Sequence, residues 1–328
     1  MDAFSAVHAA DWQRLDELSG RRRLSGAEAD ELLRLYQRTS AHLSTVRSVA
    51  PEGALSAALS MRLSRARTRF TGARSHALED LANFFVYSLP AAFYRLRWLT
   101  LAVAAVFVLA AWLFGLWVVN TPGVLAAIGS DAEVRRYVDQ DFTAYYSENP
   151  AASFAGQVWT NNAWIALQAV VFGITGVWGP YVLYQNAMGV GMAGGMMAAH
   201  GKLDVFFSYI LPHGMMELTA VFIAVAAGLR IFWAWAAPGR MTRAAALARE
   251  GRSLITVALG LVVVLFLSGL VEGFITPSGL PTWVRMGIGA ALLGAYCAYS
   301  QILGGRAYHA GHRGDLDRRD SGEVQRTA

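Results

Sequence analysis

One stretch of the sequence constrains the fold more than any other. Residues 98–119, WLTLAVAAVFVLAAWLFGLWVV, contain no charged side chain. A helix needs about 20 apolar residues to cross the hydrocarbon core of a bilayer. Inside that core the backbone polar groups must bond within the protein, which for an isolated run of this kind leaves the α-helix. We therefore expect an all-α protein built on transmembrane helices.

The rest of the chain repeats this pattern. Only 16% of the 328 residues are charged, whereas about a quarter is usual in soluble domains. The charged residues are concentrated before residue 98, so we predict a polytopic bundle of about six spans within residues 98–305. The second and third spans are short and glycine-rich and meet near Gly179-Pro180, which makes a re-entrant hairpin an alternative. The predicted spans are residues 98–119, 160–178, 181–200, 211–236, 254–275 and 283–304.

Three segments lie outside the predicted spans. Residues 1–97 are expected to form a helical region, in which Ser25 and Glu28 have capping-box spacing and Pro90 interrupts the last helix. Residues 120–158 are expected to form a polar loop, and residues 306–328 a charged, disordered tail. The N-terminus lacks the apolar stretch of a cleaved signal peptide, so the first span is expected to direct insertion.

Basic residues predict the orientation of the bundle. Arginines are concentrated after the fourth predicted span and again in the tail. Because Lys and Arg accumulate on the cytoplasmic side of membrane proteins, both segments are expected to face the cytoplasm. With six spans, both termini are then cytoplasmic, and residues 120–158 lie outside the cytoplasmic (inner) membrane. The arginines of the linker are Arg240, Arg243, Arg249 and Arg252.

Polar residues at one predicted depth form a candidate site. His213 and Glu217 are four residues apart, which places both on one face of the fourth span. Glu272 lies near the outer end of the fifth span, and Asn161 and Asn162 open the second. Ionisable groups within a membrane are costly and need a partner or a function. We therefore predict one outward-facing polar cluster.

The residue types leave three interpretations of this cluster open. Interhelical hydrogen bonds could fix the fourth span against the second and fifth. Carboxylates at membrane depth also mark solute or proton paths. One histidine and two carboxylates would further suit a catalytic zinc site, although the sequence has no HExxH motif.

Small residues in the third span predict close helix packing. Gly191 and Gly195 form a GxxxG match, which favours packing within the chain over a homo-oligomer. No phosphate-binding loop, dinucleotide fingerprint, paired CxxC or GxSxG motif occurs. The arginine clusters lack the aromatic residues typical of single-strand nucleic-acid binders. We thus expect a protein that is not an enzyme, has no cofactor and binds membrane lipids rather than nucleic acid.

Five segments carry a resemblance to a known family. They are LYQRTSAHLSTVRS at 35–48, AASFAGQVWTNNAW at 151–164, YQNAMGVGMAGG at 184–195, ILPHGMMELTAVF at 210–222 and VEGFITPSGLP at 271–281. Together they resemble the stage II sporulation protein M family in its long actinobacterial form, over about residues 10–305.

The resemblance implies a scaffold in the cell envelope. Members in endospore formers act with a peptidoglycan hydrolase and a second membrane-linked partner in septal thinning and engulfment. Actinobacterial relatives are often encoded beside a MoxR-type ATPase, which implies a role in envelope complex assembly outside sporulation. The family has no established catalytic residues, so none is transferred to this chain.

Overall fold

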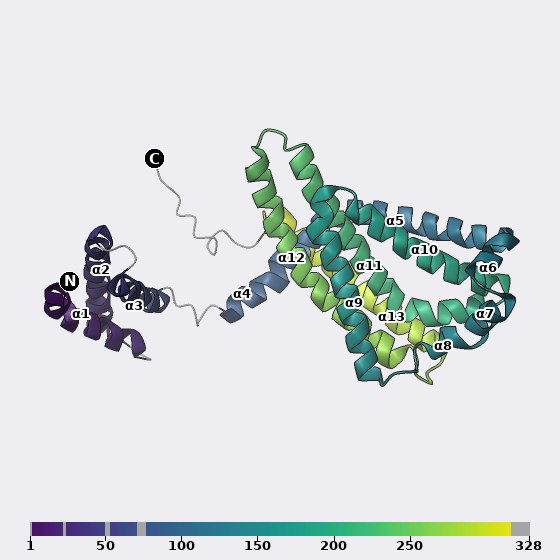
Figure 1. Ribbon diagram of the computed structural model, residues 1–328, viewed down its shortest axis with the longest axis horizontal. Helices are drawn as coiled ribbons and strands as arrows, with labels where there is room; N and C mark the ends of the chain where they lie inside the picture. Colours follow the sequence, from purple (N-terminus) through teal and green to yellow (C-terminus); the bar gives the residue numbers. More distant parts are fainter. Residues whose placement is uncertain (1, 22–23, 50–52, 71–76, 316–328) are drawn as a thin grey trace. The chain divides into compact units, whose positions relative to one another are not determined.

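The computed structural model describes residues 2–21, 24–49, 53–70 and 77–315. All regular structure in these residues is helical (Figure 1). The chain divides into two compact units, residues 1–82 and residues 83–328. The sequence predicted a boundary after residue 97, because the charged residues are concentrated before residue 98. The boundary after residue 82 is instead the one at which packing contacts divide the chain. The prediction of a disordered tail from residue 306 is wrong for residues 306–309, which belong to a helix, and residues 316–328 lie outside the described residues.

The N-terminal unit contains three helices around its own core. They are α1 (Asp2–Gly20), α2 (Gly26–Val49) and α3 (Ala54–Phe70). The predicted capping box is present, because the Ser25 backbone N–H donates to Glu28 Oε2 at 2.8 Å and the Glu28 N–H donates to Ser25 Oγ at 3.3 Å. The buried core side chains of this unit are Trp12, Leu15, Leu18, Leu32, Leu35, Val46, Leu59, Leu63 and Ala66.

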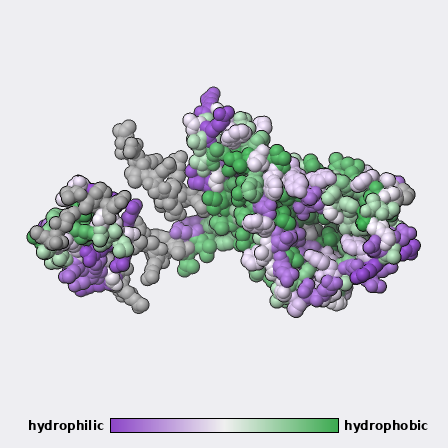
Figure 2. Space-filling view, viewed as in Figure 1, coloured by the Kyte–Doolittle hydropathy of each residue, from purple (hydrophilic) through white to green (hydrophobic). Residues whose placement is uncertain are grey.

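The second unit is built from long helices joined by short turns. Its elements are α4 (Ala77–Asn83, at the boundary), η1 (Phe84–Ser88), α5 (Leu89–Asn120), α6 (Pro122–Ile128), α7 (Asp131–Arg136), η2 (Tyr137–Asp141), α8 (Phe142–Ala144), α9 (Ala151–Val171), η3 (Phe172–Thr175), α10 (Trp178–Ala199), α11 (Leu203–Ala236), α12 (Arg243–Leu270), η4 (Val271–Ile275), α13 (Thr282–Ala298), η5 (Tyr299–Leu303) and α14 (Gly304–His309). Figure 2 shows broad hydrophobic areas on this unit, next to hydrophilic patches.

Within the described residues, four helical segments are long and apolar enough to cross a membrane. They are Leu78–Asn120, Leu203–Ala236, Arg243–Ile275 and Thr282–His309. The helices α9 and α10 have 21 and 22 residues, or about 30 Å each at 1.5 Å per residue, but they fall short in apolar composition. The described residues thus form an all-helical structure with four candidate membrane spans, while the count of six spans stays a prediction.

The predicted break at Pro90 is wrong, because the helical segment runs unbroken from Leu78 to Asn120. The π-helical turn η1, residues 84–88, ends directly before Leu89 and Pro90. A π turn changes which carbonyls face the next residues, and this allows a helix to accept a proline that would disrupt a regular α-turn.

The segment predicted as a loop over residues 120–158 is largely helical. Ser130 caps α7 through a reciprocal bond with Glu133, which accounts for the start of that helix. Lys202, at the turn between α10 and α11, bonds to Asp139 and lowers the pKa of that carboxyl. The following helix, α9, begins at Ala151 and not near residue 160, so Asn161 and Asn162 lie within it.

Glycines set the closest helix contacts of this unit. Gly191 and Gly195 both lie against α5, where a Cβ on Gly191 would be 2.4 Å from the Ala111 carbonyl oxygen. The helices α5 and α10 can therefore approach closely along this face. The turn between α9 and α10 is formed at Gly176, with φ of 72°, and not at Gly179-Pro180.

Candidate functional site

Four of the five residues of the predicted cluster meet where α9, α11 and η4 pack together. His213, Glu217 and Glu272 each place one ligand-type atom within 4.8 Å of the others. The Asn162 side chain on α9 hydrogen-bonds with the Glu217 carboxyl group. Asn161 is exposed and contacts the cluster only through Asn162, at 3.4 Å. Adjacent residues of a helix point about 100° apart, so only one of the two asparagines can face the cluster.

Hydrogen bonds fix the orientation of the His213 ring. The Thr276 hydroxyl donates to the Val271 carbonyl at 3.3 Å and lies 3.1 Å from His213 Nδ1. Because a hydroxyl has one proton to donate, it accepts from Nδ1–H. The lone pair of His213 Nε2 then faces Glu272 Oε1, which is 3.9 Å away. A proton or a cation between Nε2 and Oε1 would remove the repulsion between their lone pairs.

The local sequence explains how these groups reach one depth. Glu272 lies in the π-helical turn η4, and π turns are frequent at functional sites. Gly273 lets this turn approach α9, since a Cβ there would lie 2.7 Å from the Ala151 carbonyl oxygen. The Ser268 hydroxyl donates to the His213 carbonyl at 3.0 Å, which fastens α12 to α11.

Burial makes this cluster costly unless its polar atoms are satisfied. His213 and Glu272 are only 5% and 4% exposed, and Glu217 is half-buried. Glu272 Oε2 has no hydrogen-bond partner among the residues that the structure describes, although the carboxyl groups of Glu272 and Glu217 hydrogen-bond with each other. A buried carboxylate oxygen without a partner is unfavourable, and such atoms in a native fold call for a ligand or a function.

The structure adds residues that the sequence did not single out. Arg285 is buried and donates to the Thr276 carbonyl and, at 3.3 Å, to the Thr282 hydroxyl. Its guanidinium also lies over the Tyr209 ring, 5.2 Å from the centroid. A charged residue inside an apolar helix is a sequence signal for such a role. Nothing in the sequence marked Thr276 or Tyr146.

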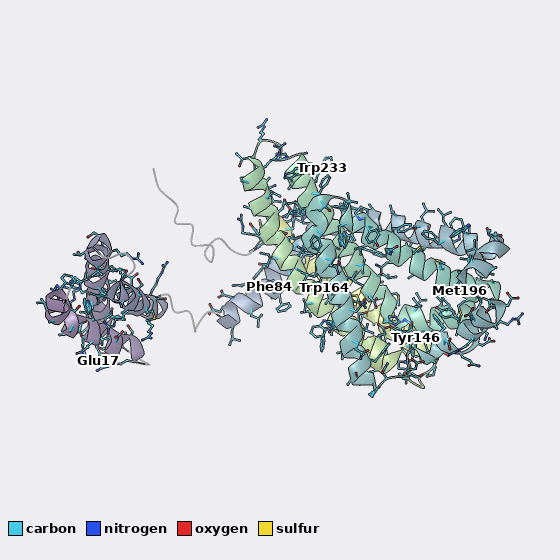
Figure 3. All side chains as sticks on the ribbon, viewed as in Figure 1. Glu17, Phe84, Tyr146, Trp164, Met196 and Trp233 are labelled. Atoms are coloured by element: carbon cyan, nitrogen blue, oxygen red, sulfur yellow. The ribbon has the colours of Figure 1, made fainter. Side chains whose placement is uncertain are left out.

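Tyr146 separates the cluster from a cavity on the side of α8. Its ring centroid lies 5.7 Å from that of His213, and burial raises the pKa of its hydroxyl group. The cavity has a volume of about 680 Å³ and is lined by residues of η2, α8, α10 and α11. Figure 3 shows Tyr146 close to these elements. Tyr146 thus lines this cavity and also packs against His213 of the cluster.

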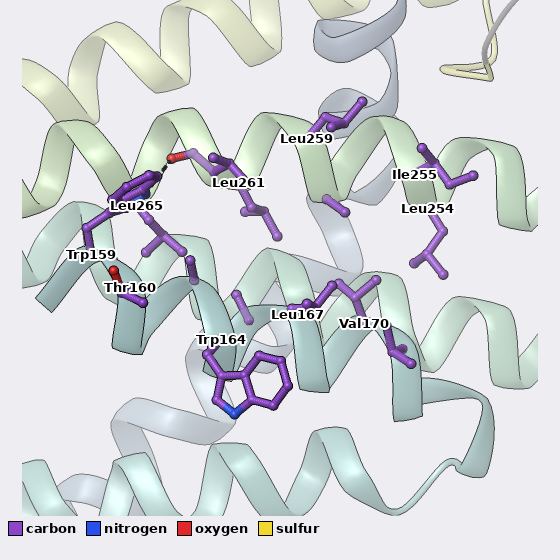
Figure 4. Close-up of a pocket in the computed structure, with 15 residues that line it drawn as sticks. Trp159, Thr160, Trp164, Leu167, Val170, Leu254, Ile255, Leu259, Leu261 and Leu265 are labelled. Atoms are coloured by element: carbon purple, nitrogen blue, oxygen red, sulfur yellow. Dashed lines mark hydrogen bonds between the residues drawn. The ribbon is translucent and has the colours of Figure 1, made fainter. Parts of the chain in front are cut away.

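A second hollow lies between α9 and α12 and is almost wholly apolar (Figure 4). Its volume is about 620 Å³. Trp159 forms one end and donates from its indole Nε1 to the Val262 carbonyl at 3.2 Å. A groove of this composition suits the acyl chains of surrounding lipid and offers no group for chemistry.

The cluster could hold a cation or pass a proton. His213, Glu217 and Glu272 supply one imidazole nitrogen and two carboxylates, the ligand types of an open zinc site. Thr276 would then act as the group that orients the imidazole ligand. Without a metal, the same three groups, whose polar atoms lie within 4.8 Å of one another, are the residue types of a short proton-exchange path.

Comparison with known families covers the residues of this site. The sequence matches the family described as Stage II sporulation protein M over residues 103–277, which is more than half of the chain. The chain belongs to the stage II sporulation protein M family. All five predicted polar residues and both glycines of the α5–α10 contact lie in the matched region. Arg285 lies beyond it.

The N-terminal unit has its own match. Residues 2–72 match a family described as a domain of unknown function, DUF8413. No curated protein and no solved structure matches the chain. The stage II sporulation protein M region and the N-terminal helices are thus distinct modules in sequence as well as in packing.

Proposed function

We propose that this member of the stage II sporulation protein M family is a non-enzymatic scaffold of the cytoplasmic membrane that assembles envelope-remodelling partners. The observation that carries the proposal is the modular construction. A helical unit with its own core, residues 1–82, precedes a unit that contains four candidate membrane spans. A folded module on a membrane anchor is the construction that a docking protein needs.

The proposed topology gives the scaffold a surface on each side of the membrane. The positive-inside rule places the N-terminal unit and the α11–α12 turn in the cytoplasm. The helices α6–α8 then lie outside, where a peptidoglycan hydrolase is the expected class of partner. The N-terminal unit would meet a cytoplasmic partner, for which a MoxR-type ATPase is the expected class. The α6–α8 segment is folded, with Val134, Val138 and Phe142 buried against α10 and α11.

Site-specific photocrosslinking in native membranes tests this proposal. A photoreactive residue replaces Tyr145 beside α8 or Met61 in α3, which are 52% and 58% exposed. A matched control replaces Leu109, 55% exposed on α5, which faces lipid in the proposed topology. Mass spectrometry should identify distinct proteins at the first two positions and none at the third. Absence of protein adducts at both test positions would contradict the scaffold.

A second function is favoured by one observation, the buried and unpartnered Oε2 of Glu272 beside His213. That arrangement also suits a small-solute or lipid transporter that moves a proton or cation through the cluster. Purified protein in liposomes distinguishes the two functions. Solute flux that is lost in Glu217→Gln and Glu272→Gln, from protein that carries no partners, would favour transport. Stoichiometric zinc in the purified protein would instead favour an intramembrane metalloenzyme.

A further inference from the structure

A charged cavity lies at the opposite end of α11 from the His213 cluster. Arg230 and Glu217 are about 20 Å apart along the helix axis, at 1.5 Å per residue. The cavity has a volume of about 330 Å³. Its walls come from α5, α11, α12, α14 and the residues after α14. The lining residues are Arg95, Arg230, Arg249, Glu250, Tyr308 and Arg313.

One carboxylate serves three arginines in this cavity. Glu250 Oε2 accepts from Arg95 Nη2 and, at 3.1 Å, from Arg230 Nε. Its other oxygen, Oε1, lies 3.6 Å from Arg249 Nη2. The side chains of Arg95 and Glu250 are only 9% and 6% exposed. The ion pairs are therefore part of the packed helix bundle.

The positive charge exceeds the negative charge here. Four arginines line the cavity, and the carboxylates near them are Glu250 and Asp315. Four arginines against two carboxylates leave a net charge of +2 around the cavity among the described residues. Uncompensated charge next to buried helices is costly, and an anion in the cavity would offset that cost.

Tyr308 in α14 and Arg313 just after it help to shape this cavity. Arg95 Nη1 donates to the Arg313 carbonyl at 3.0 Å. The Arg313 guanidinium in turn lies over the Tyr308 ring, 4.9 Å from the centroid. These contacts thus hold arginines from separate helices around one cavity. They leave some of the guanidinium N–H groups free to donate to a ligand. Guanidinium groups in this setting match the oxygens of a phosphate.

We propose that this cavity binds a phosphate group, carried by the headgroup of an anionic phospholipid or by a small soluble phosphate. Its volume is at the lower end of the range for ligand pockets, about 300–1,000 Å³, which suits a headgroup or a small ion. Basic pockets between membrane helices are a known way of binding anionic lipid headgroups. The site is independent of the His213 cluster and of the scaffold function.

Binding to the purified full-length protein in neutral detergent tests the proposal. Two probes are titrated separately at constant ionic strength, inorganic phosphate and phosphatidylglycerol in mixed micelles. The readouts are the midpoint of thermal unfolding and bound phospholipid by native mass spectrometry. Arg249→Gln and Arg313→Gln alter partly exposed residues, so both variants should fold. Arg240→Gln is the matched control. Arg240 is an exposed residue in the turn between α11 and α12, and it does not line the cavity.

The proposal predicts at least tenfold weaker binding in Arg249→Gln and Arg313→Gln, and a change of less than twofold in Arg240→Gln. Glu250→Gln should bind more tightly, because it removes the carboxylate that competes with the phosphate. Saturation by inorganic phosphate assigns a soluble phosphate, and saturation by phosphatidylglycerol alone assigns a headgroup. Equal weakening in the Arg240 variant, or no saturable binding of either probe, would overturn the proposal.

Discussion

His213 Nε2 lies 3.9 Å from Glu272 Oε1, which belongs to the next long helical segment of the chain. The contact joins α11 to the π-helical end of α12, and the Ser268 hydroxyl strengthens the junction by donating to the His213 carbonyl. Thr276 holds the ring from the other side. The orientation of the His213 ring therefore depends on the Thr276 hydroxyl group, and a mutation of Thr276 tests this dependence.

Thr276→Val should destabilise the membrane unit. The substitution keeps the side-chain volume but removes the acceptor for His213 Nδ1–H, which leaves a buried donor unpaired. Such a loss costs about 1–3 kcal/mol. Thermal unfolding in detergent measures the change. Thr219→Val on α11 is the matched control, since its hydroxyl bonds only to the Met215 carbonyl of its own helix, at 2.7 Å. Equal stability losses in the two variants would contradict the proposed role of Thr276.

Gly191→Ala should separate α5 from α10. The new Cβ would lie 2.4 Å from the Ala111 carbonyl oxygen and 2.6 Å from Phe114 Cβ, so the helices must shift. Overpacking of this kind costs about 1–3 kcal/mol. Gly189→Ala on the same helix is the control, because nothing lies within 4 Å of its Cβ position. That variant should keep or raise the midpoint of thermal unfolding, because alanine favours the helix by about 1 kcal/mol.

The N-terminal unit should lose stability as the pH falls below neutrality. Trp12 Nε1 donates to His42 Nδ1 at 3.2 Å, which requires that nitrogen to be unprotonated. Burial, and to a lesser extent the nearby His8, lower the pKa of His42 in the folded protein. The unfolded chain takes up a proton near pH 6.5. Stability is therefore complete above that pH and is lost as the pH falls towards the lower folded pKa.

Hydrogen exchange of α1 and α2 in the full-length protein measures this effect. Amide exchange, corrected for its intrinsic pH dependence, should be faster at pH 5.5 than at pH 7.5. His42→Asn is the control, because its amide oxygen can accept from Trp12 but does not titrate. A pH response of equal size in that variant would assign the effect to a titrating group other than His42.

The long apolar run at residues 98–119 predicted a membrane helix because hydrophobicity alone decides that structure. Likewise, the spacing of His213 and Glu217 predicted their shared face because it depends only on helix geometry. The role of Thr276 and the partners of Arg285 could not be predicted, since they arise where η4 and α13 meet α11. The choice between Asn161 and Asn162 needed the rotation of α9 relative to its neighbours. Pro90 was misjudged because a π turn has no sequence signature of its own.

The α9–α10 turn decides between six spans and a re-entrant hairpin. If both helices cross the membrane, the turn at Gly176 faces the cytoplasm. If they re-enter from outside, it lies within the membrane. Neither arrangement moves the arginines of the α11–α12 turn, so charge cannot separate them. A single cysteine at Val177, 71% exposed, can report the difference in a Cys297→Ser background.

Labelling with a membrane-impermeant maleimide from each side gives the answer. We expect six spans, and hence modification of Val177→Cys only after the cytoplasmic face is opened. Ser147→Cys, beside α8, should react from outside, and Arg240→Cys, in the α11–α12 turn, from inside. These two positions calibrate the sides, because the positive-inside rule fixes their expected orientation. A Val177 cysteine that stays unreactive from both sides, while both calibrating positions react, would establish the re-entrant hairpin and leave four crossings.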